Sequence, residues 1–380
     1  MKATHQISKE LVKRGHEVIV YTTDAKDPDS RLDVEPIKIV DGIKVNYMKN
    51  LSMMFIKKLN VFLTLEMASK AEEELKIFNI IHLHDYRTYQ NIVIHYYAER
   101  YNVPYIFQAH GSLPRIMEKQ KLKWVYDMCF GYRLLRDASS VIALTQTEAQ
   151  QYRDMGVPEE KIEIIPNGID LSEYENLPPK GSFKKKFNIH DNKKIVLYLG
   201  RIHRIKGIDI LVKAFYYAIK MLNFDNALLV IVGSDDGYLD ELERMLTSLN
   251  ITDSVLLTGP LYGKDKLEAY LDADVFVLPS RYETFPNVVL EAYSCSRPVI
   301  ASNVESIPDI VIHGKTGLLF RSGDAEELAK MIMRMITHPE EAEKMGCRAR
   351  KLVEEKYSIE SVVSSLETLY ERVLYSKYES

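Results

Sequence analysis

The stretch that most constrains the fold is residues 279–298, which directly follow the short apolar run 275–278. The run has the length and β-branched content of a fully buried parallel strand, and Pro279 ends it. Pro286 is placed to open a helix, because a proline at the first helical position loses no hydrogen bond. We therefore predict a strand, a loop and a helix whose N-terminus presents the free backbone amides of residues 287–289.

Two acidic residues bracket this predicted helix start. Glu283 lies in the loop, and Glu291 lies one turn into the helix on the same side as Asn287. Amides at a helix N-terminus bind anions, and Glu291 is placed to accept hydrogen bonds from ribose hydroxyls. The pattern favours a nucleotide-diphosphate site in which Asn287 and Val288 hold phosphate, but a solvated helix start would carry the same pattern.

A family resemblance rests on Glu283, Phe285, Glu291, Ala292 and the flanking Pro279-Ser280. This motif resembles the retaining glycosyltransferases of the GT-B fold, family 4 or group 1 type. The resemblance covers nearly the whole chain and implies an α/β fold of two Rossmann-like domains facing each other across a cleft. It implies an acceptor-side domain at 1–175, onto which the helix 358–380 packs back, and a nucleotide-sugar domain at 176–357.

A second basic motif lies at the predicted start of the nucleotide-sugar domain. Gly200 ends a strand and lets the backbone approach a ligand, while Arg201 and Lys206 are two cations suited to a diphosphate. Taken alone, such a loop is most often solvated. Beside the acidic motif it resembles the family's Gly-Arg and Lys-Gly element. We also assign Gly233, at a strand end, and Leu261, in the nucleobase slot that the resemblance implies, to the nucleotide site.

Two predicted strands of the first domain, 80–83 and 104–108, end in polar residues. Ligands of open α/β sheets bind beyond such carboxyl ends, so His84, Asp85 and His110 are candidates. A histidine at a strand end is usually structural. The resemblance, however, matches His110 to the histidine that meets the donor sugar, and places Asp85 where acceptor contacts gather.

The resemblance implies transfer of a hexose from a nucleotide-diphosphate sugar with retention at the anomeric carbon. His110, Glu283, Arg201 and Lys206 would be the catalytic residues, with Phe285 among the residues around the nucleotide. We expect no metal and no cofactor besides the donor itself. The acidic pairs at 235–236 and 272–274 are interpreted as structural.

The beginning of the chain departs from the family pattern. A helix at 2–13 is followed by a strand at 17–22, whereas relatives begin with a strand and a glycine-pair loop ahead of that helix. We therefore expect the first strand of the first domain to be missing. In a doubly wound sheet that strand is central, so its neighbours would keep unpaired backbone groups.

Composition excludes several classes of protein. The formal net charge is -4, with no basic excess for nucleic-acid binding. Three scattered cysteines predict a reduced, cytoplasmic setting, and no apolar run approaches the ~18 residues of a membrane span. The basic and aromatic stretch 112–136 would suit anionic headgroups if the acceptor is lipid-linked, although an amphipathic helix with inward aromatics explains it equally well. In the stretch 49–63, apolar residues interleave with lysines, and this pattern favours a helix or loop facing the core over a membrane-surface element.

Two other functions remain compatible with the sequence. A nucleotide-sugar epimerase of the same fold would form product from the donor alone, without an acceptor. A catalytically silent nucleotide-sugar-binding subunit would turn over no donor. Neither the sugar, the nucleobase, the acceptor nor the oligomeric state follows from the sequence.

Overall fold

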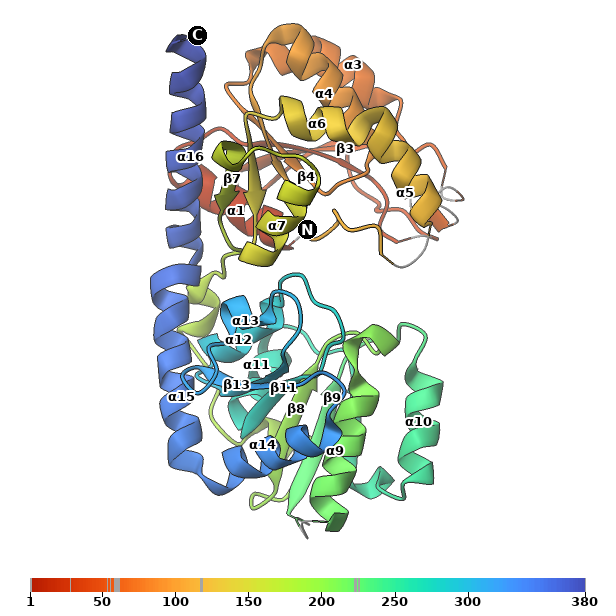
Figure 1. The fold of residues 1–380 in the computed structure, drawn as a ribbon, viewed down its shortest axis with the longest axis vertical. Coiled ribbons are helices and arrows are strands. Elements are labelled where there is room, and N and C mark those ends of the chain that lie inside the picture. The colour runs from red at the N-terminus through yellow and green to blue at the C-terminus, as the bar shows by residue number, and fades with distance from the viewer. Residues whose placement is uncertain are drawn as a thin grey trace. The chain divides into compact units, whose positions relative to one another are not determined.

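The structure, a computed structural model, divides the chain into two units (Figure 1). The first comprises Met1–Gly168 with Ile359–Ser380, and the second comprises Ile169–Ser358. The structure describes residues 2–27, 29–52, 54, 56–57, 62–116, 119–221, 224 and 226–379. The division precedes the predicted boundary at residue 175, because the Ile169 amide donates to the Tyr357 carbonyl and Tyr174 is buried within the second unit.

The second unit is built on one sheet of six parallel strands. The strands are β8 (Lys194–Leu199), β9 (Ala227–Val232), β10 (Val255–Gly259), β11 (Val275–Leu278), β12 (Val299–Ser302) and β13 (Gly317–Phe320). Their order is β10-β9-β8-β11-β12-β13. The sheet grows in one direction from β8 and in the other from β11, so the order reverses between these two strands.

Helices cover both faces of this sheet. They are α8 (Ser182–Lys186), α9 (Ile208–Met221), α10 (Leu239–Ser248), α11 (Gly263–Asp272), α12 (Asn287–Ser294), α13 (Ile307–Ile310), α14 (Ala325–Thr337) and α15 (Pro339–Leu352). Short turns are η4 (Leu171–Tyr174), η5 (Arg204–Lys206), η6 (Thr252–Ser254) and the π-helix η7 (Val353–Tyr357). The alternation of strand and helix produces the parallel sheet that the sequence predicts.

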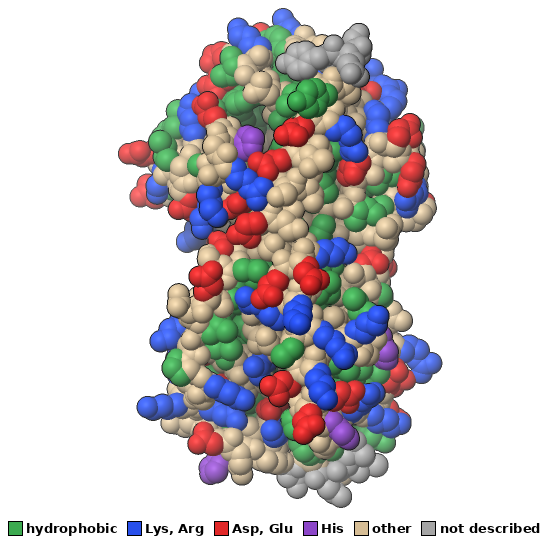
Figure 2. Space-filling view, turned by 90° about the vertical axis from the view of Figure 1, so that its left-hand side faces the viewer, with side chains coloured by type: hydrophobic (Ala, Val, Ile, Leu, Met, Phe, Trp, Pro, Cys, Tyr) green, Lys and Arg blue, Asp and Glu red, His purple; other side chains and the backbone are tan. Residues whose placement is uncertain are grey.

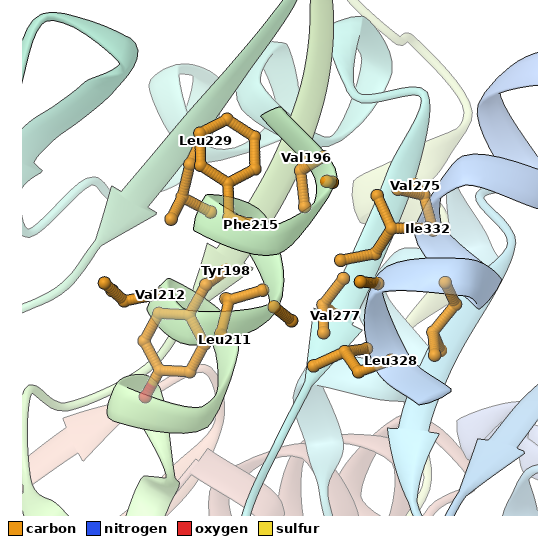
Figure 3. Packing of buried hydrophobic residues seen from close by; sticks show 14 of the residues in the cluster. Val196, Tyr198, Leu211, Val212, Phe215, Leu229, Val275, Val277, Leu328 and Ile332 are labelled. Carbon is orange, nitrogen blue, oxygen red and sulfur yellow. The ribbon is translucent and has the colours of Figure 1, made fainter. Parts of the chain in front are cut away.

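The core of the second unit lies between the sheet and helices α9 and α14 (Figure 3). Leu211 and Phe215 of α9, four residues apart, bury the same face of that helix, as do Leu328 and Ile332 of α14. Figure 3 shows Phe215 beside Leu229 of β9. This packing holds the strands whose ends carry the candidate site.

The first unit contains two separate sheets. One has the strands β1 (Ile19–Thr23), β2 (Ile37–Val40) and β3 (Ile43–Met48) in the order β1-β3-β2. The other has the parallel strands β4 (Ile81–His84), β5 (Tyr105–Gln108), β6 (Ser140–Ala143) and β7 (Ile162–Ile164) in chain order. Within the described part of the chain, no strand joins β1 to β4. The predicted hairpin of β2 and β3 is present, with positive φ at Asp41 and Gly42.

The helices of the first unit include one from the end of the chain. They are α1 (Lys2–Lys13), α3 (Glu66–Glu74), α4 (Tyr89–Tyr101), α5 (Gln120–Tyr126), α6 (Tyr132–Asp137), α7 (Gln146–Asp154) and α16 (Ile359–Glu379), with the short turns η1 (Leu75–Ile77), the π-helix η2 (Asp127–Gly131) and η3 (Glu159–Lys161). Helix α16 packs on this unit through Val363 and Leu366, beside Ile106 of β5 and Ile142 of β6. Arg14 also pairs with Glu367 of α16 at 2.6 Å.

The surface carries both signs of charge. On the face drawn in Figure 2, Lys and Arg side chains are interspersed with Asp and Glu and form no continuous basic stripe. Among the described residues, no helix combines the length and apolar character needed to cross a membrane. Part of the interleaved stretch 49–63, namely Met53, Phe55 and residues 58–61, lies outside the described residues.

Candidate active site

The candidate site of the second unit lies where the order of the strands reverses. The loop after β8 carries Gly200, Arg201 and Lys206, and the loop after β11 carries Glu283 and leads into α12. Open α/β sheets bind ligands beyond the carboxyl ends of the strands at such a reversal. The two motifs that the sequence analysis combined therefore belong to the two strands that flank the reversal.

Glycines allow the strand ends to approach each other closely. A Cβ atom on Gly233 would lie 1.8 Å from the carbonyl oxygen of Gly200, and a Cβ on Gly207 would lie 2.0 Å from that of Pro279. Gly207 also has a φ of +67°, which side chains disfavour. Any larger residue at these positions would push the loops apart.

Lys206 and Glu283 form an ion pair across the reversal. Lys206 Nζ donates to Glu283 Oε2 at 2.7 Å, and both side chains are largely buried. The Ser280 hydroxyl donates to the same carboxylate oxygen at 3.2 Å, and the Ser306 hydroxyl donates to the Glu283 carbonyl at 2.9 Å. The predicted acid and cation are therefore neighbours held in a fixed arrangement.

A second ion pair, which the sequence analysis did not identify, joins the same two loops. Arg281 donates through both terminal nitrogens to Asp209 at 2.7 Å, and its amide donates to the Ile205 carbonyl at 2.8 Å. Burial alone would raise the pKa of Asp209, but the bidentate guanidinium outweighs it and lowers that pKa. The pair ties the Lys206 loop to the Glu283 loop.

Glu291 of α12 is buried and held by α11. Lys266 Nζ donates to Glu291 Oε1 at 2.7 Å, and the Tyr270 hydroxyl donates to Oε2 at 3.1 Å. Burial first, and then the Glu291 charge, raise the pKa of Tyr270, so its hydroxyl keeps its proton and remains a donor. Lys266 and Tyr270 contact Glu291 from α11, and no local sequence pattern predicts a contact between two helices.

The start of α12 differs from the prediction. Pro286 is the N-cap rather than the first helical residue, and its φ of −81° and ψ of 87° bend the chain so that the Asn287 amide donates to the Phe285 carbonyl at 3.1 Å. The Val289 amide donates to the Pro286 carbonyl at 2.9 Å. Two of the three amides predicted to be free are thus already bonded, and among the described residues only that of Val288 has no recorded partner there.

Other predicted residues have clear places. Phe285 is buried with its ring 6.3 Å from that of Tyr357, so its side chain packs within the second unit. Arg201 is exposed and pairs with Asp236 at 2.5 Å. Leu261 is partly buried beyond β10, whose Gly259 carbonyl accepts from the Gly233 amide at 3.1 Å.

The acidic pairs interpreted as structural are bound to backbone or to a cation. Asp235 accepts from the amides of Gly237, Tyr238 and Leu239. Asp272 accepts from the amides of Gly181 and Lys184 around the start of α8, and Asp274 accepts from the Ile195 amide at 2.8 Å. These bonds give the carboxylates roles within the fold.

In the first unit, three histidines cluster at the ends of β4 and β5. His84 Nδ1 lies 2.9 Å from His110 Nε2, and the His82 ring stacks on His84 with ring centroids 4.2 Å apart. His82 Nδ1 lies 2.8 Å from the hydroxyl of Tyr370 on α16. Asp85, by contrast, is exposed and has a φ of +62°.

Burial keeps these imidazoles neutral. It lowers the pKa of His82 to about 3 and lowers those of His84 and His110, although Asp85 opposes the effect at His110. One proton is therefore shared between His84 Nδ1 and His110 Nε2, which couples the tautomers of the two rings. His110 has a φ of +51°, and the next amide, that of Gly111, donates to the buried Glu148 at 2.5 Å.

Comparison with known families decides what this pair of units is. A family model described as glycosyl transferases group 1 matches residues 179–352, and one described as Glycosyltransferase Family 4 matches residues 2–173. The chain belongs to the group 1, family 4 glycosyltransferases. The family recognised from the motif around Glu283 and Glu291 is thereby confirmed.

Relatives of this glycosyltransferase span nearly its whole length. It is 28% identical over 376 residues to an uncharacterized glycosyltransferase of Methanocaldococcus jannaschii, covering 96% of this chain and 92% of the relative. It is 26% identical to N-acetyl-alpha-D-glucosaminyl L-malate synthase of Bacillus anthracis, covering 97% and 92%. The first name gives only the class of enzyme, and the second also names a product, N-acetyl-alpha-D-glucosaminyl L-malate.

Solved structures confirm the fold of the glycosyltransferase. Anabaena HepE, in a complex with UDP and glucose, superposes with a TM-score of 0.77 at 19% identity, covering 97% of this chain and 95% of HepE. Sucrose-phosphate synthase from Thermosynechococcus elongatus gives 0.77 at 24% identity, covering 98% and 93%. The predicted α/β architecture of two Rossmann-like domains is correct.

Proposed function

We propose that this glycosyltransferase moves a hexose from a nucleotide-diphosphate sugar to an acceptor with retention at the anomeric carbon. The observation that carries the proposal is the Lys206–Glu283 pair at the reversal between β8 and β11. It sets a cation and a carboxylate 2.7 Å apart where the fold binds ligands. The glycosyl-transfer names of the relatives and the UDP bound to HepE support the same donor class.

The hard step of this reaction is the departure of the diphosphate. The bond between the anomeric carbon and a phosphate oxygen breaks with both electrons going to the oxygen, while the acceptor oxygen bonds to the same face of that carbon. The acceptor proton passes to the departing phosphate oxygen. Negative charge therefore grows on the diphosphate, and catalysis consists mainly of stabilising it.

The residues of the second unit take separate roles in this proposal. Lys206, Arg201 and the Val288 amide stabilise the diphosphate, while Glu283 orients sugar hydroxyls. Glu291, fixed by Lys266 and Tyr270, accepts from the ribose. The proline at position 286 has no amide to offer, which removes one donor from the helix start.

The first unit is proposed to bind the acceptor and to present His110 to the sugar. The neutral, partly buried His110 ring can donate or accept at the nitrogen that His84 does not hold. Asp85, exposed at the end of β4, is proposed as an acceptor contact. No metal is proposed, since the cations named above are placed to meet the charge. Undiminished transfer in the presence of a metal chelator tests this point.

The protein is proposed to act in the cytoplasm, peripherally at the inner face of the membrane if its acceptor is lipid-linked. Cys129, Cys295 and Cys347 are free thiols, which suits a reducing compartment. Burial raises the pKa of Cys295 to about 12, so that thiol is unreactive.

A thermal-shift screen against uridine, guanosine and adenosine diphosphate sugars tests the donor class. A ligand at a hundred times its Kd stabilises the protein by about 2.7 kcal/mol. One nucleotide series is expected to raise Tm, and transfer from that donor should then keep the anomeric configuration of the sugar in the product. Product from the donor without any acceptor would indicate an epimerase instead, and tight nucleotide binding without turnover would indicate a silent binding subunit.

A further inference from the structure

Six large apolar side chains of one segment of the first unit stand exposed. They are Leu122, Trp124, Val125, Met128, Phe130 and Tyr132, with exposed fractions from 36% to 56%, and together they form what we call the apolar ridge. Figure 1 shows α5, which carries the first of them, at the periphery of the first unit. Monomeric soluble proteins rarely expose so many neighbouring apolar groups without a partner for them.

The sequence analysis left two explanations for residues 112–136, a surface for anionic headgroups and an amphipathic helix with inward aromatics. The outward direction of these side chains decides between them. Helices α5, η2 and α6 follow one another without a break, and their inward side carries Asp127, Gly131 and Leu134, all buried. Of the aromatic residues, Tyr126 packs inward, with its ring 5.9 Å from that of Tyr86. The amphipathic helix with inward aromatics therefore explains only a part of the stretch.

The ridge is surrounded by positive charge. Residues 112–136 contain six Lys and Arg against two acidic residues, in a chain whose net charge is -4. Lys119, Lys121 and Arg133 are exposed. Of the six cations, Arg115 shares the buried Asp127 with Arg87, and Arg136 pairs with Asp137, so the exposed positive charge comes from Lys119, Lys121 and Arg133. Apolar and aromatic groups among cations match the boundary of an anionic bilayer.

The same buried pairs fix the ridge to the acceptor side of the unit. Arg87, directly beyond the end of β4, donates to Asp127 of η2 at 2.9 and 2.8 Å, and the Tyr126 hydroxyl donates to the Thr88 carbonyl at 3.1 Å. The ridge is thereby held rigidly to the loop that begins at Asp85. A surface bound to the ridge would lie in fixed relation to that loop.

We propose that the apolar ridge docks the protein on an anionic lipid bilayer. Trp124 and its apolar neighbours enter the headgroup boundary, and the surrounding cations bind acidic headgroups. The inference deepens the proposed peripheral localisation and rests on the proposed function only for its purpose, access to a lipid-linked acceptor. A second copy of the chain fits the ridge less well, because two such basic surfaces would repel each other.

The chain supplies its own probe, because Trp124 is its only tryptophan. The full chain is mixed with vesicles of phosphatidylcholine alone or with a third of phosphatidylglycerol, without donor or acceptor. On the anionic vesicles, Trp124 emission is expected to shift to shorter wavelength and to be quenched by brominated lipid. Raising the salt concentration should weaken the binding, since it screens the headgroup charge.

Variants locate the surface. Val125→Glu is expected to lower the vesicle partition coefficient about tenfold or more, since it places a charge in the apolar boundary. Lys121→Ala should lower it about fivefold on anionic vesicles only. The matched control is Ile39→Glu, which changes an apolar residue that is 72% exposed on β2 of the same unit, and it should bind as the natural chain does.

Three results would overturn the proposal. They are no binding to anionic vesicles, equal binding by the natural chain and Val125→Glu, and a dimer in solution that Val125→Glu converts to a monomer. Circular dichroism checks that each variant is folded. Because the assay needs no transfer, its failure leaves the proposed reaction standing, and failure of the reaction leaves the docking surface standing.

Discussion

The candidate sites of the two units differ in how charge is held. In the second unit, Lys206, Lys266 and Arg281 are each matched by a carboxylate at 2.7 Å. In the first unit, burial keeps the clustered imidazoles uncharged. A site made of paired ions can give a cation to an incoming phosphate, whereas a site made of neutral rings offers hydrogen bonds that do not favour an anion. In the proposed function, donor and acceptor binding therefore rest on distinct physical chemistry.

The largest effect is expected for Glu283. Glu283→Ala removes the group that orients the sugar and leaves Lys206 without its partner, so kcat should fall about 10²- to 10³-fold. Initial rates at saturating donor measure this. Glu326→Gln, which changes an exposed acid at the start of α14, is the matched control and should keep full activity. Turnover by Glu283→Ala close to that of the control would remove Glu283 from the mechanism.

Nucleotide affinity should respond to Glu291 more than to Arg201. Glu291→Ala removes a buried carboxylate that is fixed by Lys266 and Tyr270, so Kd should rise about tenfold or more. Arg201→Ala removes an exposed cation, and its effect should be only severalfold. Calorimetric titration with the nucleoside diphosphate measures both. An unchanged Kd in both variants would contradict the assignment of this crevice.

The neutral histidines predict how the stability of the first unit depends on pH. The unfolded chain protonates histidine near its ordinary pKa of 6.5, whereas folded His82 does so only near 3, so the unfolded state binds more protons between these values. The free energy of unfolding is therefore highest above pH 6.5 and decreases as the pH falls toward 3. For one histidine the decrease is up to about 1.4 kcal/mol per pH unit.

Denaturant unfolding followed by Trp124 emission measures the free energy of unfolding at each pH. The signal reports on the first unit, where the single tryptophan lies. Glu148, whose pKa burial raises, acts in the opposite sense, because its stabilising effect is lost as the pH rises through its raised pKa. His82→Gln should therefore flatten the slope below pH 6.5, whereas His5→Gln, at an exposed position, should not. Equal slopes in the two variants would refute a buried neutral His82.

A moderate effect on kcat alone is expected for His84, a positioning residue that acts through His110. His84→Ala should lower kcat about tenfold without changing nucleotide Kd, because it frees the His110 tautomer and ring orientation. His84→Asn should restore part of the rate, since its amide occupies the place of Nδ1. A loss of nucleotide affinity, or no rescue by asparagine, would indicate a merely structural role.

The proximity of the loops after β8 and β11 could be predicted from the sequence because their residues lie in two short contiguous stretches. Each stretch, Gly200 to Lys206 and Glu283 to Glu291, belongs to one strand-loop-helix unit, and the local sequence pattern predicts such a unit. The long-range contacts were missed, since Lys266 and Tyr270 approach Glu291 from α11. Asp209, at the start of α9, pairs with Arg281 of the other loop. The amides of Asn287 and Val289 were predicted to be free, but the turn at Pro286 bonds both of them. That turn depends on the ψ angle of Pro286, which the sequence does not reveal.

The histidine cluster of the first unit was less predictable for a physical reason. His84 and His110 were marked by their places at strand ends, but their mutual contact depends on the pairing of β4 with β5. The exposure of Trp124 and Phe130 depends on which face of α5 and η2 turns inward, and in sequence both faces mix apolar and charged residues. Periodicity cannot choose between two such faces.

A crystal structure of the protein with the nucleoside diphosphate selected by the thermal-shift screen tests the central claim most directly. The account predicts the diphosphate between the loop after β8 and the start of α12, with Lys206 Nζ and the Val288 amide within hydrogen-bonding distance of its oxygens and Glu291 at the ribose. A nucleotide bound elsewhere, or a Lys206–Glu283 pair that stays closed with no phosphate beside it, would contradict it.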